Sequence, residues 1–581
     1  MPSQSNKNKL NVRKKNTFKL IKSLVQFVVI SLLAVLLIRT LFITERYESL
    51  SSDTMVNEEG FLAISYFGVD RSGSAQHVSK EQLETQLTVL KEQGFETISQ
   101  QQILDYYHEG KPLPEKALYL SFEDGRTDSS IFSQSLLEEL NYKATMYTYA
   151  DKFEERDTKF LKPNDLKTMI RSGYWELGTN GYQLSYINTF NEHGESLGEL
   201  DDIPIPDQPD IEYYNHYLMD YLRDEYMIPK ETRREMEQRI LNQYNKMHES
   251  YTEYFDEIPN AYAIMHANSM YNNMDQSVEA INEEMIKENF SLHFNRDLTS
   301  FNGPKTDIYN LNRLQVAPWW STNHLLMKIQ EDYDWGIQFE NGDESIANLW
   351  SINGGVGEFV GEKIILTSQS EKEVVATLKE ELPEPYRISM NLEGNIMGEQ
   401  TFYLSNDNKE LKFSIEQNKL YIYQQKSDKE EVLFETNLSE IKWNQDDYAF
   451  NKAMVYTYED TQQGSRVDDD EYPVTLQNNR QIVLDVDEQE ITVEIDGRSM
   501  IQIDWVNEEN LTQFAVGGKI VDLNTEHQQN TDTIYDSVVN MLQITSEDDM
   551  IYQVIPPAEN KLKRDIKYKT DEIINFFIEY L

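Results

Sequence analysis

Short apolar segments alternate with amphipathic ones over residues 60–340, and this rhythm constrains the fold more than any other feature of the chain. FLAISYFGV, ALYLSF and ATMYTYA have the composition of buried strands. KEQLETQLTVLKEQG places Leu83, Leu87 and Leu90 on one helical face, and Gly94 is positioned to end that helix. Strands that alternate with helices favour a parallel sheet covered by helices, so we predict an α/β domain here.

An acidic, proline-rich interruption, residues 186–229, breaks this rhythm and contains DDIPIPDQPDIEYY. It is longer than an ordinary loop, so it predicts either an ordered lid or a disordered insert. After residue 345, ELKFSIEQNKLYIYQQ and IVLDVDEQEITVEIDG alternate apolar and polar residues. This pattern predicts an antiparallel β-sandwich over residues 345–549. The remaining tail, residues 550–581, ends in a predicted helix, DEIINFFIEYL.

The N-terminus predicts a membrane anchor. Residues 19–43 contain SLVQFVVISLLAVLLI, which can cross a bilayer core of about 30 Å if Lys22 and Arg39 extend toward the surfaces. The basic residues 1–18 are expected to stay in the cytoplasm. No small-x-small site follows, so an uncleaved signal anchor is favoured over a cleaved signal peptide. We therefore expect a single-pass protein of the cell membrane, with a stalk over residues 44–59 and its bulk outside the cell.

Charge and cysteine content exclude several function classes. The chain has 53 Lys and Arg against 101 Asp and Glu, a formal net charge of −48, and eight of the bases precede residue 40. An outer part this acidic repels nucleic acid. It indicates either simple solubility or affinity for a cationic partner, such as a polysaccharide with free amines. The absence of cysteine excludes disulfides and thiolate metal sites, so a metal would need His, Asp or Glu.

Residues 61–326 resemble the polysaccharide deacetylase family, the NodB-homology domain of carbohydrate esterase family 4. The resemblance rests on the opening strand FLAISYFGV, the run SKEQLETQLTVLKEQGFETISQQQILDYYHEGKPLPEKALYLSFEDG and the closing segment DIYNLNRLQVAPWWSTNHLLMKI. It implies a (β/α) barrel and metal-assisted hydrolysis of an N-acetyl group. In the family, one Asp is the general base, while the next Asp and two histidines hold the metal, usually zinc.

The resemblance retains the carboxylates of this motif and loses its histidines. It places Glu123 at the position of the base and Asp124 at that of the metal-binding Asp. Asn180 and Leu184 stand at the two histidine positions, and Phe67 replaces a histidine of the opening strand. Leucine cannot ligate a metal and asparagine is a poor zinc ligand, so we predict no metal site. Zinc or another divalent metal is expected only if the family's activity survives.

Each candidate site residue also has a structural explanation. Glu123 and Asp124 could cap a turn or a helix, and adjacent strand residues point to opposite faces, which argues against a cooperating acid–base pair. No two of the nine histidines stand three or four apart, although His266 could approach Asp124. Aromatic rings near the motifs are predicted either to stack on sugar or to fill the core. The predicted substrate-binding residues are Asn180, Trp175, Tyr182, Trp319 and Trp320.

The C-terminal region resembles, in pattern only, the concanavalin-like and laminin-G-like sandwiches found as carbohydrate-binding modules, in segments such as NLWSINGGVGEFVGEKIILTS and VEIDGRSMIQI. Binding glycan and packing on the barrel both stay open. For the whole chain we favour a bacterial envelope protein that binds a cell-surface polysaccharide through a degenerate site. The alternatives are a hydrolase with altered chemistry, either a polysaccharide N-deacetylase or a glycoside hydrolase, and a zinc deacetylase with an unusual metal set.

Overall fold

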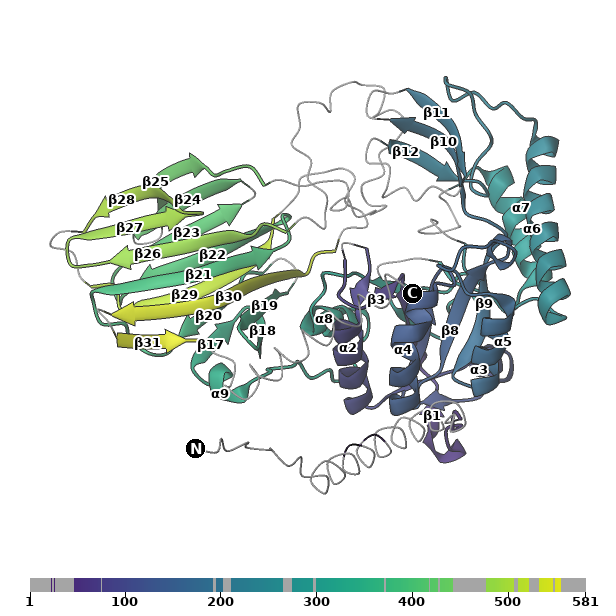
Figure 1. Ribbon diagram of the computed structural model, residues 1–581, viewed down its shortest axis with the longest axis horizontal. Helices are drawn as coiled ribbons and strands as arrows, with labels where there is room; N and C mark the ends of the chain where they lie inside the picture. Colours follow the sequence, from purple (N-terminus) through teal and green to yellow (C-terminus); the bar gives the residue numbers. More distant parts are fainter. Residues whose placement is uncertain are drawn as a thin grey trace, which may run out of the picture.

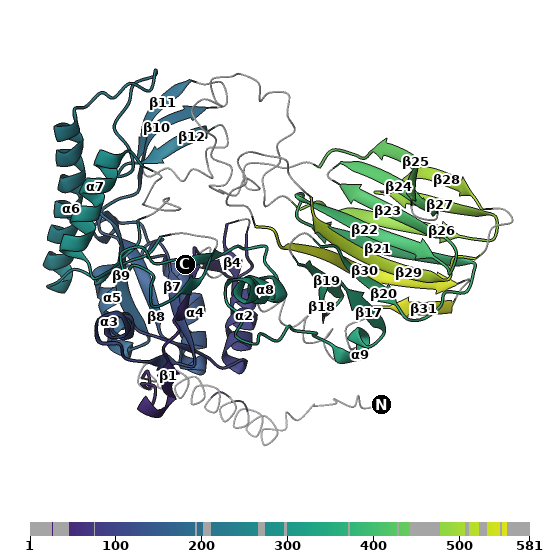
Figure 2. The same cartoon turned by 180° about the vertical axis from the view of Figure 1, so that it is seen from behind.

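The computed structural model describes residues 22, 26, 46–74, 76–191, 195–201, 211–264, 274–295, 299–369, 372–416, 418–426, 429–441, 477–505, 510–521, 532–546 and 549–554. They form two domains, an α/β barrel and a β-sandwich, that lie side by side (Figures 1 and 2). The predicted anchor lies outside them apart from two residues, and stays a prediction. Within the described ranges, no helix combines the length and apolar character needed to cross a bilayer.

Parallel strands form the barrel wall, in the order β14-β13-β9-β8-β7-β2-β15, with β5 beside β7 and β16 beside β2. Every pair is parallel except β2–β15. A parallel bridge from Phe294 to Leu311 joins the two ends of the sheet, which confirms the predicted barrel-like domain. The strands are β2 (Phe61–Tyr66), β5 (Phe95–Thr97), β7 (Lys116–Phe122), β8 (Ala144–Tyr149), β9 (Trp175–Gly181), β13 (Ala261–Tyr262), β14 (Leu292–His293), β15 (Phe301–Asn302) and β16 (Leu314–Val316).

Helices cover the outside of the wall, and the alternation of strand side chains creates two cores. Leu118 and Leu120 face the helices, whereas Tyr119 faces the barrel interior with Tyr147. The helix α2 ends just before Gly94, whose φ is 86°, as predicted. The helices of this domain are α2 (Lys80–Glu92), α3 (Gln100–Glu109), α4 (Thr127–Leu140), α5 (Pro163–Ser172), α6 (Arg233–Phe255), α7 (Gln276–Asn289) and α8 (Thr322–Asp332).

The interruption forms a three-stranded antiparallel sheet where it is described, in the order β11-β10-β12. Figure 1 shows this sheet above the carboxyl ends of β8 and β9. Its strands are β10 (Ser185–Asn191), β11 (Ser196–Asp201) and β12 (Ile211–His216). Two small ladders pair β1 (Met55–Asn57) with β6 (Leu113–Pro114) and β3 (Val69–Asp70) with β4 (Val78–Ser79). The described part of the insert is thus folded into a sheet above the barrel, an arrangement compatible with a lid.

Two antiparallel sheets form the C-terminal sandwich and enclose one hydrophobic core. The predicted alternation is confirmed, because Leu411, Phe413 and Ile415 on one strand and Leu420 and Ile422 on the next are all fully buried. One sheet contains β17 (Trp350–Asn353), β20 (Val374–Leu378), β29 (Gln513–Ile520), β22 (Gly398–Ser405), β23 (Glu410–Glu416), β24 (Lys419–Lys426) and β25 (Lys429–Asn437). The other contains β18 (Gly355–Val360), β19 (Lys363–Ser368), β30 (Tyr535–Ser546), β21 (Tyr386–Gly394), β26 (Arg480–Val486), β27 (Glu490–Ile495), β28 (Arg498–Asp504) and β31 (Asp549–Gln553).

The short helix α9 (Glu344–Ala347) lies between the two domains in the chain. The first residues of the predicted tail, 550–553, belong to β31 of the sandwich. The predicted C-terminal helix lies outside the described residues.

Candidate functional site

The candidate site lies at the carboxyl end of β7, where Glu123 and Asp124 follow the strand in the sequence FEDG. Their side chains are 1% and 7% exposed. Asp124 has a left-handed backbone (φ 61°), and Gly125 follows with φ 63°. A Cβ atom at Gly125 would lie 2.7 Å from Cγ2 of Thr148, so glycine lets this turn press against β8.

Glu123 is one half of a buried ion pair. Its Oε1 accepts from Nη1 of Arg313, a residue just before β16 that is 2% exposed. Nδ2 of Asn180 lies 3.4 Å from the other oxygen, Oε2. The Arg313 guanidinium also lies over the Tyr147 ring, 5.7 Å from its centroid. The carboxylate at the position of the family's base is therefore held by a fixed cation.

Asn180 and Leu184, at the two histidine positions, both have structural roles: Asn180 makes hydrogen bonds and Leu184 packs in an apolar cluster. Asn180 donates to the carbonyl of Ala263 (3.0 Å) and accepts from the Asp124 backbone N–H (3.4 Å). Leu184 packs against Tyr186 in a small apolar cluster of the insert. A carboxamide that is already hydrogen-bonded within the protein and an aliphatic side chain cannot replace the two histidine ligands of the family's zinc site. Among the described residues, no group of three or more His, Asp and Glu could hold a metal ion, and His266 lies outside that part of the chain.

Asp124, unlike Glu123, has a carboxylate oxygen, Oδ1, without a hydrogen-bond partner among the described residues. Helix α4 starts after Arg126 without a side-chain cap, so Asp124 does not cap it. Burial raises the pKa of Asp124 to about 7; Arg126 opposes this shift, and Glu123 adds to it. Lys159 and Arg313 also lower that pKa. A carboxyl group with this pKa exchanges protons near neutral pH, which suits general acid–base chemistry.

Two of the predicted sugar-contacting rings are part of the protein core. Trp175 and Trp320 are 2% and 3% exposed, and Trp320 stacks on His324 with ring centroids 4.7 Å apart. This corrects the prediction for both, because a buried ring offers no face to a sugar. Trp319 and Tyr182 are half-buried against the same core.

Sequence reasoning missed three side chains near the motifs. Arg313 lies inside the closing segment of the family resemblance, but no pattern in the neighbouring sequence predicts that it is buried. Tyr149 ends β8 next to the site and has a pKa raised by burial and by Asp124. His77 stacks on Phe67, with ring centroids 6.0 Å apart. Phe67 is the residue that stands at the position of the family's opening-strand histidine.

No protein-family model matches the chain. A stretch of 91 residues is 38% identical to the poly-β-1,6-N-acetyl-D-glucosamine N-deacetylase of Escherichia coli K12, and 37% identical to that of strain O157:H7. Each match covers 15% of this chain and 14% of the relative. The chain thus aligns with only a small part of these curated relatives.

Solved structures that align with the chain include the de-N-acetylase from Aggregatibacter actinomycetemcomitans, at 17% identity over 46% of this chain and 99% of that one, with a TM-score of 0.36. IcaB from Ammonifex degensii aligns at 17% identity over 45% and 94%, with a TM-score of 0.32. The carbohydrate-binding module CBM66 from Bacillus subtilis aligns at 9% identity over 36% and 99%, with a TM-score of 0.22.

The curated relatives are N-deacetylases, and the family resemblance of the sequence includes the motif FEDG, which the structure places at the end of β7. In the matched stretch of sequence the chain is therefore similar to polysaccharide N-deacetylases, and residues other than histidine stand at both histidine positions that the resemblance assigns.

Proposed function

We propose that the barrel domain recognises a cell-surface polysaccharide of N-acetylated amino sugars, of the poly-β-1,6-N-acetylglucosamine class, at the carboxyl ends of β7, β8 and β9. The observation that carries this proposal is the buried pair Glu123 and Asp124 in a deacetylase-type barrel. Arg313 holds one of these carboxylates, and the other is left open for a ligand. The substrate class comes from the curated relatives, which are N-deacetylases of that polymer.

Hydrolysis of the N-acetyl group is the second candidate, and the comparisons favour it over a purely non-catalytic domain, because the matched relatives are deacetylases. The residues of this chain limit how it would occur. Asn180 and Leu184 do not supply the family's metal ligands, so Asp124 is the group with a pKa suited to move a proton. Glu123 would have to leave Arg313 before it acted as a base.

Calorimetry with β-1,6-linked N-acetylglucosamine oligomers tests recognition, with β-1,6-glucan oligomers as the matched sugar control. We expect the full chain, in detergent micelles, to bind the first and not the second. Acetate release in the same samples, measured with and without added zinc and with a chelator, tests hydrolysis. Failure to bind the N-acetylated oligomer would contradict the proposal, and acetate release would select the hydrolytic candidate.

A further inference from the structure

Two buried polar groups at the barrel mouth lack a hydrogen-bond partner. In the described part of the chain, neither Oδ1 of Asp124 nor the hydroxyl of Tyr149 is paired, although the residues are 7% and 2% exposed. Leaving a buried donor or acceptor unpaired costs about 1–3 kcal/mol each. Groups of this kind in a folded protein call for an occupant that supplies the missing bonds.

The two groups come from the adjoining ends of neighbouring strands. Strands β7 and β8 run parallel, with Phe122 opposite Met146, so the turn after β7 lies beside the end of β8. Gly125, which follows Asp124, lies against Thr148, which precedes Tyr149, so Asp124 and Tyr149 extend from backbone segments that are in contact. The charge of Asp124 also acts on the Tyr149 phenol, after burial the largest influence on its pKa.

The chemistry of the two groups selects the occupant. A carboxylate accepts hydrogen bonds and a phenol donates one, so together they complement a group that has both an N–H and a C=O. The surroundings of Asp124 contain charges of both signs, because the cations of Arg126, Lys159 and Arg313 and the anion of Glu123 all act on it, so the site offers no strong net attraction to a charged ligand. A carboxylate ligand would be repelled by the carboxylates of Glu123 and Asp124. A neutral secondary amide satisfies both groups without adding charge.

We infer that Asp124 and Tyr149 together hold the acetamido group of one N-acetylated sugar residue, with its N–H donating to Asp124 Oδ1 and the Tyr149 hydroxyl donating to its C=O. This inference rests on the proposed function and adds to it the residues that recognise the acetyl group directly. In this inference, two protein side chains bind the acetamido group at the place where the family resemblance implies a metal ion.

The test measures the affinity of the full chain for two ligands, the β-1,6-linked N-acetylglucosamine oligomer and the same oligomer after chemical de-N-acetylation. Tyr149→Phe removes the phenol donor, and Asp124→Asn replaces the charged acceptor by a neutral and weaker one, each with little change in volume. We expect each to weaken binding of the N-acetylated oligomer about tenfold, the scale of one lost hydrogen bond. The matched controls Tyr254→Phe on α6 and Asp128→Asn on the exposed start of α4 should bind like the wild type.

A second measurement separates ligand recognition from a structural role. Because the Tyr149 hydroxyl has no partner in the described protein, Tyr149→Phe should leave the thermal midpoint unchanged or raise it. A lowered midpoint would reveal an internal partner and overturn the inference. Unchanged affinity in both variants, or equal wild-type affinity for the two oligomers, would also overturn it while the proposed function stands. No binding of either oligomer by the wild type would instead defeat the proposed function.

Discussion

At the scale of single residues, the Glu123–Arg313 ion pair makes the strongest prediction about stability. Both side chains are almost fully buried, so removing one partner leaves an uncompensated charge inside the barrel. We expect Arg313→Met to lower the free energy of unfolding by about 3–5 kcal/mol, and Glu123→Gln/Arg313→Met to recover much of that loss. Urea unfolding of the single and double variants measures both effects.

The matched control is Arg233→Met, because the Arg233 side chain is 67% exposed and pairs with Glu237 on the surface of α6. Exposed pairs of this kind contribute about 0–1 kcal/mol. If Arg313→Met cost no more than Arg233→Met, the buried pair would not stabilise the fold.

The residues of the site were only partly predictable. The motif resemblance brought Glu123, Asp124 and Asn180 together, and their hydrogen bonds agree with that grouping. Arg313 was missed because its partner lies 190 residues earlier, and no local pattern marks a buried arginine. Trp175 was misplaced because composition does not distinguish a core indole from one that stacks on sugar.

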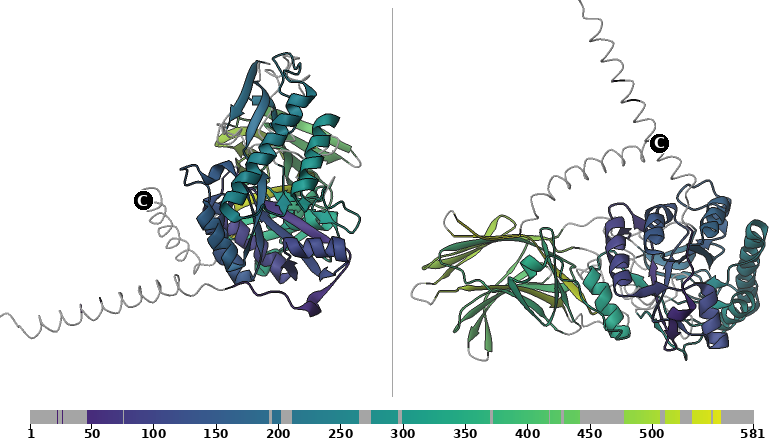
Figure 3. Two further views of the ribbon diagram at one scale, coloured as in Figure 1. Left: turned by 90° about the vertical axis from the view of Figure 1, so that its right-hand side faces the viewer. Right: turned by 90° about the horizontal axis from the view of Figure 1, so that it is seen from below.

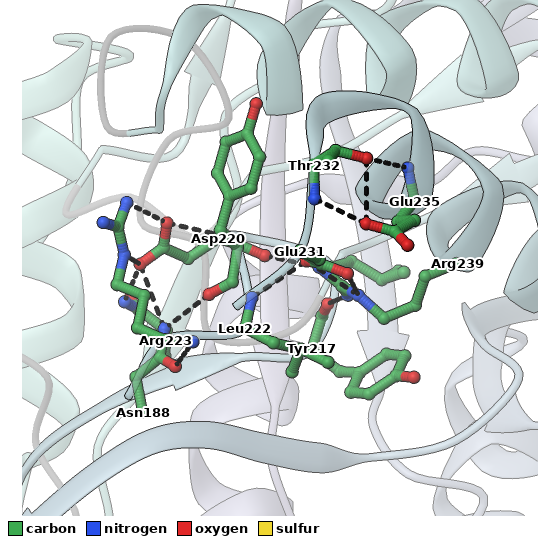
Figure 4. Close-up of polar contacts among 12 residues, drawn as sticks. Asn188, Tyr217, Asp220, Leu222, Arg223, Glu231, Thr232, Glu235 and Arg239 are labelled. Atoms are coloured by element: carbon green, nitrogen blue, oxygen red, sulfur yellow. Dashed lines mark hydrogen bonds and ion pairs between the residues drawn. The ribbon is translucent and has the colours of Figure 1, made fainter. Parts of the chain in front are cut away.

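At the scale of elements, the insert sheet depends on a polar network at its base, which Figure 4 shows. Arg223 makes two contacts of 2.8 Å with Asp220, which also accepts from Asn188 of β10 (3.1 Å). Arg239 of α6 pairs with Glu231 (2.7 Å) and donates to the carbonyls of Tyr217 and Asp220. These contacts attach the segment between β12 and α6 to the helix.

Replacing Arg239 should therefore loosen the insert without unfolding the barrel. Arg239 and Glu231 are each 9% exposed. Arg239→Met therefore leaves the buried Glu231 carboxylate without its cation, although the backbone N–H of Leu222 still donates to it, and removes the Arg239 donor from two carbonyls. We expect amide hydrogen exchange in β12 and in residues 217–222 to accelerate about 100-fold, with β7 and β8 unchanged. Arg234→Met, at an exposed position of α6, is the control. Equal exchange in β12 of both variants would contradict this account.

The strands and helices of the α/β rhythm followed from local periodicity, but the insert did not. Its strands β10 and β12 pair across an acidic segment rich in proline, so their partners are not adjacent in the sequence. Long-range pairing of short strands leaves no periodic signal comparable to that of α2. The sequence therefore left a lid and a disordered insert equally open.

At the scale of the whole molecule, α8 of the barrel contacts β18 of the sandwich. Figure 2 shows α8 on the side of the barrel next to the sandwich, and Figure 3 shows the two domains side by side from below. His324 of α8 lies between two carboxylates, with Nδ1 3.1 Å from Asp536 and Nε2 2.6 Å from Asp532. Asp536 also accepts from the backbone N–H of Ser321 (2.8 Å) and from Thr367 of β19 (2.7 Å). The sequence could not predict this contact, because its charges lie more than 200 residues apart.

The geometry of His324 makes domain docking depend on pH. Both ring nitrogens face carboxylates, so the doubly protonated ring fits best. Burial lowers the pKa of His324, but Asp532 and Asp536 outweigh this effect and raise it to about 9 from 6.5. A raised pKa in the folded state contributes stability that is complete below the unfolded value of 6.5 and is lost as the pH rises through 9. The contribution is ~3 kcal/mol at most.

We therefore expect the thermal midpoint of the wild type to fall between pH 6.5 and pH 9 more steeply than that of His324→Gln, which should already be lower at pH 6. Lys328, which lowers the pKa of Asp532, is unchanged in both proteins. His248→Gln, at an exposed position of α6, should follow the wild type across the whole range. Calorimetric scans of the three proteins at pH 6, 7.5 and 9 measure this difference. Parallel pH profiles for the wild type and His324→Gln would show that the ring is not charged at the interface, and that the two domains dock through their neutral contacts.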